Sequence, residues 1–220
     1  MGQQQTEKFL LIVHHLNNSR SQRVLWMLEE LEAEYDIRRY KRRVDMRAPE
    51  ELKKVHPLGK SPVIEDVVDG HRTVFVETGA ICEYLVDRSG GLLGPLDGAD
   101  GIRRYQQFLH YAEGSVMPVL FALLVAAQVP LLGRFAARKV RPMLNVHLDY
   151  IEAELASRPW FAGDAISAAD IMMSFPLEAV RAKVGLEHCG PSTNAWLDRI
   201  HARPAYLRAL AKGGPYRFID

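Results

Sequence analysis

A strand, a short polar loop and a helix follow one another between residues 9 and 31, and this succession constrains the fold more than any other stretch. Residues 9–13 are all apolar and include two β-branched side chains, which favours a buried strand. The loop Asn17-Asn18-Ser19 consists of residues that favour turns and helix N-caps. Apolar side chains then recur at helical spacing, at Val24, Leu25, Leu28 and Leu31. The first part of the chain therefore predicts a β-strand that passes through a tight turn into an α-helix.

The loop of this motif lies at the N-terminus of the predicted helix. Unpaired backbone N–H groups and the helix dipole favour negative charge at such a position. A hydroxyl of Ser19 or Ser21 could also donate a hydrogen bond to a bound anion. The same residues suit an ordinary helix cap, so this stretch alone leaves both an anion site and a purely structural role open.

The next segments predict more strands and short helices. Residues 35–44 alternate in part and indicate a second strand, with five basic residues that suit a solvated edge. Residues 48–55 predict a short helix. Asp69-Gly70 is a turn signal between strand-like runs at residues 63–68 and 73–76, so a β-hairpin is expected there.

Two loops of this region suit the binding of an amino acid or an extended peptide. Ser61 precedes Pro62 in a loop rich in Pro and Gly, where its backbone can pair with an extended ligand. At Glu77 and Thr78 a strand passes into a helix. The Thr78 hydroxyl and the helix N–H groups suit a carboxylate, and Glu77 suits an ammonium group. An ordinary helix cap is again the alternative role for Glu77 and Thr78. With this helix, the predicted order of elements in the first part of the chain is βαβαββα.

The composition changes at residues 90–98, which contain four glycines and one proline. Such a stretch is typical of a linker between domains. We therefore expect one domain over residues 1–89 and a second over residues 99–220.

Residues beyond the linker predict helices throughout. The longest runs are residues 102–128, with a kink expected at Pro118, and residues 131–157. Ser167 and Asp170 form a capping box for a further helix, which we interpret as structural and not as a catalytic acid.

Composition and charge exclude several function classes. A net charge of +1 argues against a nucleic-acid binder. The two cysteines, Cys82 and Cys189, form no CxxC motif, which disfavours a disulfide framework, a thioredoxin-type reductase and an oxidising compartment. The histidines show no metal-ligand spacing, and the longest apolar run, residues 116–129, is too short for a membrane span. We expect a cytoplasmic protein without metal, membrane span or signal peptide.

Four pieces stand in a fixed order along the chain: residues 18–24, residues 57–63, residues 77–85 and residues 160–171. Together they resemble the cytosolic glutathione S-transferase family over almost the full chain. The resemblance implies an N-terminal thioredoxin-like α/β domain with a mixed four-stranded sheet, an all-α C-terminal domain and a homodimer. It also implies glutathione as co-substrate, with no further cofactor.

The resemblance assigns roles to single residues. Ser61, before Pro62, would pair its backbone with the cysteinyl part of glutathione. Glu77 and Thr78 would hold the γ-glutamyl end, and Lys60 would meet the glycyl carboxylate.

The residue that activates the thiol is less fixed by the resemblance, because no Tyr or Cys stands in the loop of residues 16–21. Serine classes place their serine four residues before an arginine such as Arg23, which selects Ser19. A five-residue spacing would select Asn18, and Ser21 remains a further alternative. The absence of a loop cysteine disfavours thiol-transferase chemistry.

The resemblance therefore predicts a transferase that conjugates the glutathione thiolate to a hydrophobic electrophile, or reduces a peroxide with it. An apolar electrophile pocket is expected near Tyr111, Met117 and Phe121, although these side chains also suit ordinary core packing. The alternative is a non-catalytic relative that keeps the fold as a ligand-binding or assembly module.

Overall fold

The computed structural model describes residues 9–129, 132–184 and 189–219. Its internal contacts divide the chain into two units. The first comprises the residues up to Leu85 together with Pro204–Tyr216, and the second comprises Val86–Arg203 with the residues from Arg217 onward. The division falls a few residues before the predicted linker. The last helix, which the sequence alone assigned to the helical domain, groups by its contacts with the first unit.

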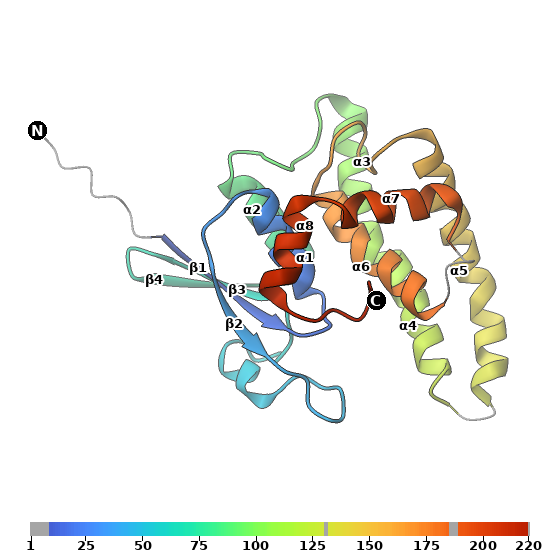
Figure 1. Cartoon of the computed structure of the whole chain (residues 1–220), viewed down its shortest axis with the longest axis horizontal. Coiled ribbons are helices and arrows are strands. Elements are labelled where there is room, and N and C mark those ends of the chain that lie inside the picture. Colours follow the sequence, from blue (N-terminus) through green and yellow to red (C-terminus); the bar gives the residue numbers. More distant parts are fainter. Residues whose placement is uncertain (1–8, 130–131, 185–188, 220) are drawn as a thin grey trace, which may run out of the picture. The chain divides into compact units, whose positions relative to one another are not determined.

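The first unit contains a four-stranded mixed sheet with the strand order β2-β1-β3-β4 (Figure 1). The strands are β1 (Phe9–Leu16), β2 (Asp36–Tyr40), β3 (Val63–Val68) and β4 (His71–Val76). β2 runs parallel to β1, whereas β3 runs antiparallel to both of its neighbours. The predicted mixed sheet is confirmed. The second strand is shorter than expected, because residues 41–43 are all basic and offer no apolar side to bury.

Helix α1 (Ser21–Glu30) packs on β1 and is covered in turn by α8 (Pro204–Gly213). The rings of Trp26 and Tyr206 meet edge to face at 5.2 Å between centroids. The buried Glu29 accepts hydrogen bonds from Arg208 and Lys212 on α8. Two more elements complete this unit, the short 3₁₀ helix η1 (Glu50–Lys54) and α2 (Thr78–Arg88), and the fold is thioredoxin-like. Because α8 closes over α1, the side chains of α1 are buried on both its sheet side and its outer side.

The second unit is helical in its described residues, as predicted. It comprises α3 (Gly98–Tyr111), a π-helical turn η2 (Ala112–Val116), α4 (Met117–Ala126), α5 (Leu132–Ser157), α6 (Ala168–Lys183) and α7 (Pro191–His201). The irregularity expected at Pro118 occurs one turn earlier, in η2, and Pro118 lies in the first turn of α4. Proline is tolerated there because its missing N–H group would have no partner in a first helical turn.

Helix α6 forms the centre of this second unit, and its residues 168–180 are all buried. It packs against α3. The aromatic rings of Phe108, Phe161 and Trp196 contact one another in series, at 4.8 and 5.2 Å between centroids. The predicted capping box of Ser167 and Asp170 is present at the start of α6.

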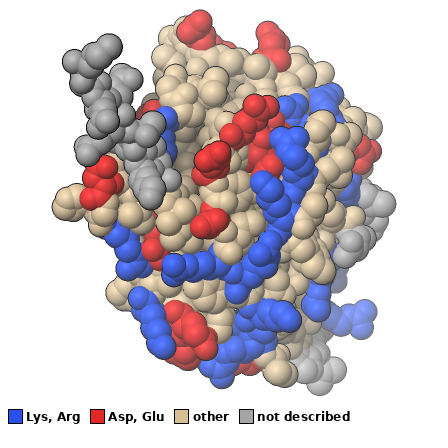
Figure 2. Space-filling model, turned by 60° about the vertical axis from the view of Figure 1, so that its left-hand side comes forward, with Lys and Arg blue, Asp and Glu red and all other residues tan. Residues whose placement is uncertain are grey.

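The surface carries both signs of charge. On the face shown in Figure 2, acidic and basic side chains lie close to one another, in keeping with the net charge of +1. One continuous helical stretch among the described residues, Gly98–Ala126, is long and apolar enough to cross a membrane by length and composition. Only 39% of its apolar window is buried, and core helices of soluble proteins pass the same test. The expectation of no membrane span therefore stays a prediction.

Candidate active site

The register of the sheet brings three of the predicted loops to one end of it. His14 near the end of β1 pairs with Val63 at the start of β3, and Val63 pairs with Val76 at the end of β4. The loop of residues 17–20, the residues before Pro62 and the Glu77-Thr78 junction all extend from this row. Segments that lie far apart in the sequence therefore converge at one sheet end within the first unit.

Ser19 and Ser21 form a hydrogen-bonded pair at the start of α1. Their hydroxyl oxygens lie 2.8 Å apart, and the backbone N–H of Ser21 donates to the Ser19 oxygen at 3.2 Å. The Ser21 hydroxyl also accepts from the Leu16 N–H at 3.2 Å and lies 2.9 Å from Nδ1 of His15. Both serines are buried. The Ser21 hydroxyl is thus enclosed by partners from the chain itself.

His15 determines the direction of hydrogen bonding in this pair. Burial, with a smaller contribution from Arg39, lowers the pKa of His15 to about 4, so the ring is neutral at pH 7. Its hydrogen bond with the backbone of Gly213 opposes this shift, as an acceptor carbonyl does. A neutral imidazole carries one N–H, which serves Gly213. Nδ1 is then an acceptor, so the Ser21 hydrogen is used by this nitrogen, at 2.9 Å, or by the Leu16 carbonyl, at 3.3 Å. The Ser21 hydroxyl has no second hydrogen to donate. Of the two serines, Ser19 is therefore the one whose hydroxyl hydrogen can be donated to another acceptor.

Asn18 lies in the same loop with a positive φ of 51°. Its backbone carbonyl accepts a hydrogen bond from Arg42 at 3.0 Å, and Arg42 also donates its backbone N–H to the side chain of Asn17 at 2.8 Å. Arg42 is one of the five clustered basic residues. Its part in this structure is to hold the loop before α1 in place.

The loop before β3 contacts the end of β1 directly. The Ser61 hydroxyl donates to the carbonyl of His14 at 2.8 Å, and the Ser61–Pro62 peptide bond is cis. Pro62 is buried, Ser61 is partly exposed and Lys60 is exposed. The ammonium group of Lys60 is therefore accessible to a ligand at this sheet end.

Glu77 and Thr78 lie at the start of α2, with Glu77 exposed at a positive φ of 68° and Thr78 buried. Arg23 of α1, itself buried, lies with Nη2 3.4 Å from the Thr78 hydroxyl oxygen, to which it can donate. This contact joins the starts of α1 and α2. A guanidinium group has no acceptor, so the Thr78 hydroxyl keeps its own hydrogen for a ligand.

The three residues predicted for an electrophile pocket have different environments in the second unit. Met117 is buried, and the hydroxyl of Tyr111 lies 2.6 Å from Nδ1 of His147. Phe121 of α4 is 62% exposed. Phe121 therefore offers the most accessible apolar surface of the three.

A second polar network, centred on the buried His14 and Glu65, ties the strands of the sheet together. His14 lies between the Tyr40 hydroxyl, at 2.8 Å from Nδ1, and the Glu65 carboxylate, at 2.6 Å from Nε2. Glu65 also pairs with Arg72 at 2.6 Å. Burial lowers the pKa of His14, against the opposing effect of Glu65. These four residues come from all four strands, and their mutual pairing indicates a structural role.

Sequence reasoning missed two residues that organise the site. His15 gives no motif signal, since it is one of two adjacent histidines at the end of an apolar strand. The only cue is general, because a buried polar side chain must find a hydrogen-bond partner. Arg23 served only to align the serine spacing, and its contact with Thr78 depends on the packing of two helices that are 55 residues apart.

Family models and individual proteins identify relatives of this chain. The model of the glutathione S-transferase N-terminal domain matches residues 19–88, and that of the C-terminal domain matches residues 116–204. Glutathione S-transferase 3 of Schizosaccharomyces pombe is 35% identical over 92% of this chain and 88% of its own length. Glutathione S-transferase 1 of Saccharomyces cerevisiae is 34% identical over 92% and 95%.

A solved structure shows the same likeness. A glutathione transferase of Burkholderia graminis, with two glutathione molecules bound per subunit, superposes with a TM-score of 0.75 and is 26% identical, covering 91% of this chain and 87% of its own. Together the two matched family models cover more than half of the sequence, and each unit contains matched residues. With its four-stranded mixed sheet and helical second unit, the chain belongs to the cytosolic glutathione S-transferase family.

Proposed function

We propose that the protein is a glutathione transferase that activates the thiol of glutathione and adds the sulfur to a hydrophobic electrophile. The observation that carries this proposal is the convergence of the three loops at one end of the sheet. The relatives in two yeasts and the glutathione-bound transferase of Burkholderia graminis support glutathione as the ligand.

The binding roles follow from the position of each group. Thr78 and the start of α2 would hold the γ-glutamyl carboxylate, with Arg23 orienting the Thr78 hydroxyl, and Glu77 would hold the ammonium. The backbone of Ser61 would pair with the cysteinyl unit. Lys60 would meet the glycyl carboxylate.

Ser19 is the proposed activating residue. An ordinary thiol has a pKa of about 8.5, so little of it is ionised at pH 7. A hydrogen bond to a charged acceptor contributes roughly 1.5–3 kcal/mol. Since one pKa unit corresponds to about 1.36 kcal/mol, a bond from Ser19 would lower the thiol pKa by roughly one to two units. Ser21 would act as a positioning residue, because its hydrogen is used by His15 or by the Leu16 carbonyl.

The thiolate would then form a sulfur–carbon bond with an apolar electrophile as the electrophile's leaving group departs. The exposed Phe121 is the accessible apolar contact among the predicted pocket residues. The same thiolate could attack a hydroperoxide oxygen, releasing the alcohol, and a second glutathione would complete that reduction. Both reactions would depend on the same hydroxyl.

The test is a pH titration of the ultraviolet thiolate absorption of bound glutathione, together with turnover of a chlorodinitrobenzene-type electrophile. We expect Ser19→Ala to raise the bound thiol pKa by roughly one to two units, with a corresponding loss of kcat/KM at neutral pH. The matched Asn18→Ala variant should leave the thiol pKa unchanged. A shifted pKa in Asn18→Ala and an unshifted one in Ser19→Ala would overturn the assignment.

Binding can be separated from activation with Thr78→Ala, which should raise the KM for glutathione and leave the thiol pKa of the bound tripeptide in place. A wild-type protein that binds glutathione but turns over neither aryl halides nor hydroperoxides would instead be the non-catalytic binding or assembly module.

A further inference from the structure

We propose that the outer face of the first half of α5 binds the surface of a bilayer that contains anionic lipids. This α5 outer face consists of two kinds of exposed side chain. The apolar ones are Leu132, Phe135, Pro142, Met143 and Val146, and the basic ones are Arg134, Arg138, Lys139 and Arg141. It is separate from the glutathione site proposed in the first unit.

The apolar part is a row along the helix. Leu132, Phe135, Pro142 and Val146 recur at separations of three, seven and four residues, which places them on one side of a helix. Leu132 and Phe135 are each 71% exposed, and Val146 is 68% exposed. A different side of α5 carries Leu144, Leu148 and Ile151, which are buried. Helix α5 therefore has a core side and a second apolar side that no described residue covers.

Exposed apolar side chains gather at this hairpin of α4 and α5. Of the fourteen large apolar side chains that are exposed in the described residues, seven lie between Phe121 and Val146. Val125 and Val129 contribute from the α4 side. Figure 1 shows that α4 and the first half of α5 extend past α6 and α7 within the second unit. Neighbouring helices thus leave this end of the hairpin open.

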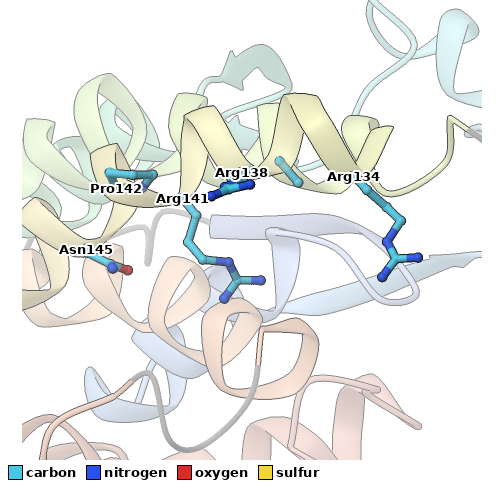
Figure 3. Close-up of a pocket in the computed structure, with 6 residues that line it drawn as sticks. Arg134, Arg138, Arg141, Pro142 and Asn145 are labelled. Carbon is cyan, nitrogen blue, oxygen red and sulfur yellow. The ribbon is translucent and has the colours of Figure 1, made fainter. Parts of the chain in front are cut away.

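The basic part is a second row beside the first. Arg134, Arg138 and Arg141 recur at separations of four and three residues and, with Asn145, line a hollow of about 390 Å³ (Figure 3). Arg134 and Arg141 extend from the same side of α5 in that view. Arg134 and Arg138 therefore place two positive charges along the edge of the apolar row.

The sequence around this face contains no acidic residue, which favours an anionic partner. The sequence contains no Asp or Glu between Glu113 and Asp149, although 27 such residues occur in the chain. A helix that combines exposed apolar side chains with Lys and Arg binds at the boundary of anionic membranes, where the apolar groups enter the acyl region and the bases meet phosphates. The α5 outer face has both features in adjacent rows. Such peripheral binding requires no membrane span.

The test is co-sedimentation of the full-length protein with phosphatidylcholine vesicles, with and without phosphatidylserine. We expect binding that requires phosphatidylserine and weakens as salt is added. One basic residue near an anionic surface contributes a factor of roughly five, so Arg134→Gln/Arg138→Gln should lower the partition coefficient roughly thirtyfold. Phe135→Ser should lower it roughly tenfold.

Matched controls alter exposed side chains elsewhere. Leu207→Ser on α8 and Lys53→Gln/Lys54→Gln on η1 should change vesicle binding by less than about twofold. Binding that is absent, or equal for all variants, would overturn the proposal. So would a wild-type oligomer that dissociates in Phe135→Ser without any vesicle binding, because the face would then be a contact between copies of the chain.

Discussion

Helices α1 and α6 both begin next to buried serines, yet their N-termini differ in one respect. At α6, Ser167 is the N-cap and Asp170 completes a capping box, so the chain supplies its own negative charge. The first turn of α1 has no acidic residue, and its N-cap, Arg20, forms no side-chain capping bond. The positive end of the α6 dipole is therefore neutralised within the fold, whereas that of α1 remains available to an external anion.

The partners of the serines show the same contrast. Asp170 accepts hydrogen bonds from the N–H groups of Phe161 and Ser167, each at 3.0 Å, and from the Trp196 ring at 3.3 Å. The Asp170 carboxylate is therefore occupied by hydrogen bonds within the fold. Ser19 accepts from the backbone N–H of Ser21 and contacts the Ser21 hydroxyl, so its own hydrogen can turn to a stronger acceptor. In this protein, the serine that is followed by an acidic residue three positions later, Ser167, has a structural role at its helix start. Ser19 has no such acidic residue at its helix start.

The largest expected effect on stability lies on the α6 side. Asp170→Ala removes an acceptor from several buried donors, so we expect it to lower the free energy of unfolding by roughly 3–5 kcal/mol. Urea unfolding at pH 7 measures this loss. Asp170→Asn is the matched control and should cost less, because one carbonyl oxygen remains to accept. A loss below about 1 kcal/mol for Asp170→Ala would remove the distinction between the two helix starts.

Protonation of His15 and protonation of Asp170 should change the stability of the fold in opposite directions. His15 has its pKa lowered from 6.5 to about 4, so the unfolded chain binds the proton more readily and stability falls as the pH drops through this window. Burial raises the pKa of Asp170 from 3.8 to about 6, so the folded chain binds the proton more readily and stability rises as the pH drops. Each effect reaches up to about 3 kcal/mol.

Single variants separate these opposing contributions. Between pH 7 and pH 5 the unfolding free energy of Asp170→Asn should fall, with about 2 kcal/mol of the fall due to His15 and a further part due to His14, whose pKa is also lowered. That of His15→Asn should fall by less, because the His15 part is absent and Asp170 opposes the His14 part. Urea unfolding curves at the two pH values measure both. Parallel pH dependences for the two variants would contradict the predicted opposition.

A smaller effect is expected for Ser167→Ala. Loss of an N-cap hydroxyl costs typically 0.5–2 kcal/mol, so we expect roughly 1 kcal/mol in urea unfolding. The thiol pKa of bound glutathione should not change, because Ser167 caps a helix of the other unit. A change in thiol pKa would show that this cap also influences the site.

The smallest stability effect is expected for Ser19→Ala. The backbone N–H of Ser21 loses one acceptor, and we expect less than about 1 kcal/mol in urea unfolding. The glutathione thiol, in contrast, should lose its activation. A stability loss as large as that of Asp170→Ala would mean that Ser19 is a structural residue.

Local signals in the sequence account for most of the fold and for the choice of candidate site residues. The hairpin at Asp69-Gly70, the capping box and the helix that begins at Thr78 each depend on a few neighbouring residues. Ser61 and Glu77 were placed by the resemblance. The register that brings them to one sheet end depends on contacts between strands.

Contacts between distant segments account for what the sequence did not predict. The packing of α8 on α1 and the bond from His15 to Gly213 join residues almost 200 positions apart, and no local pattern encodes them. The exposed row on α5 has the same helical period as a buried row, so periodicity alone cannot say which side faces the core. The helix is irregular at the π-helical turn η2 and not at Pro118. This turn depends on backbone hydrogen bonding that the position of the proline alone does not specify.

The covering of α1 by α8 has a consequence for synthesis. The segment Pro204–Tyr216 is translated after the helices of the second unit, yet it completes the packing of the unit to which α1 belongs. A nascent chain must therefore leave the outer side of α1 uncovered until α8 has emerged from the ribosome. Cleavage or a stop codon just before Pro204 would expose Trp26 and His15 to water.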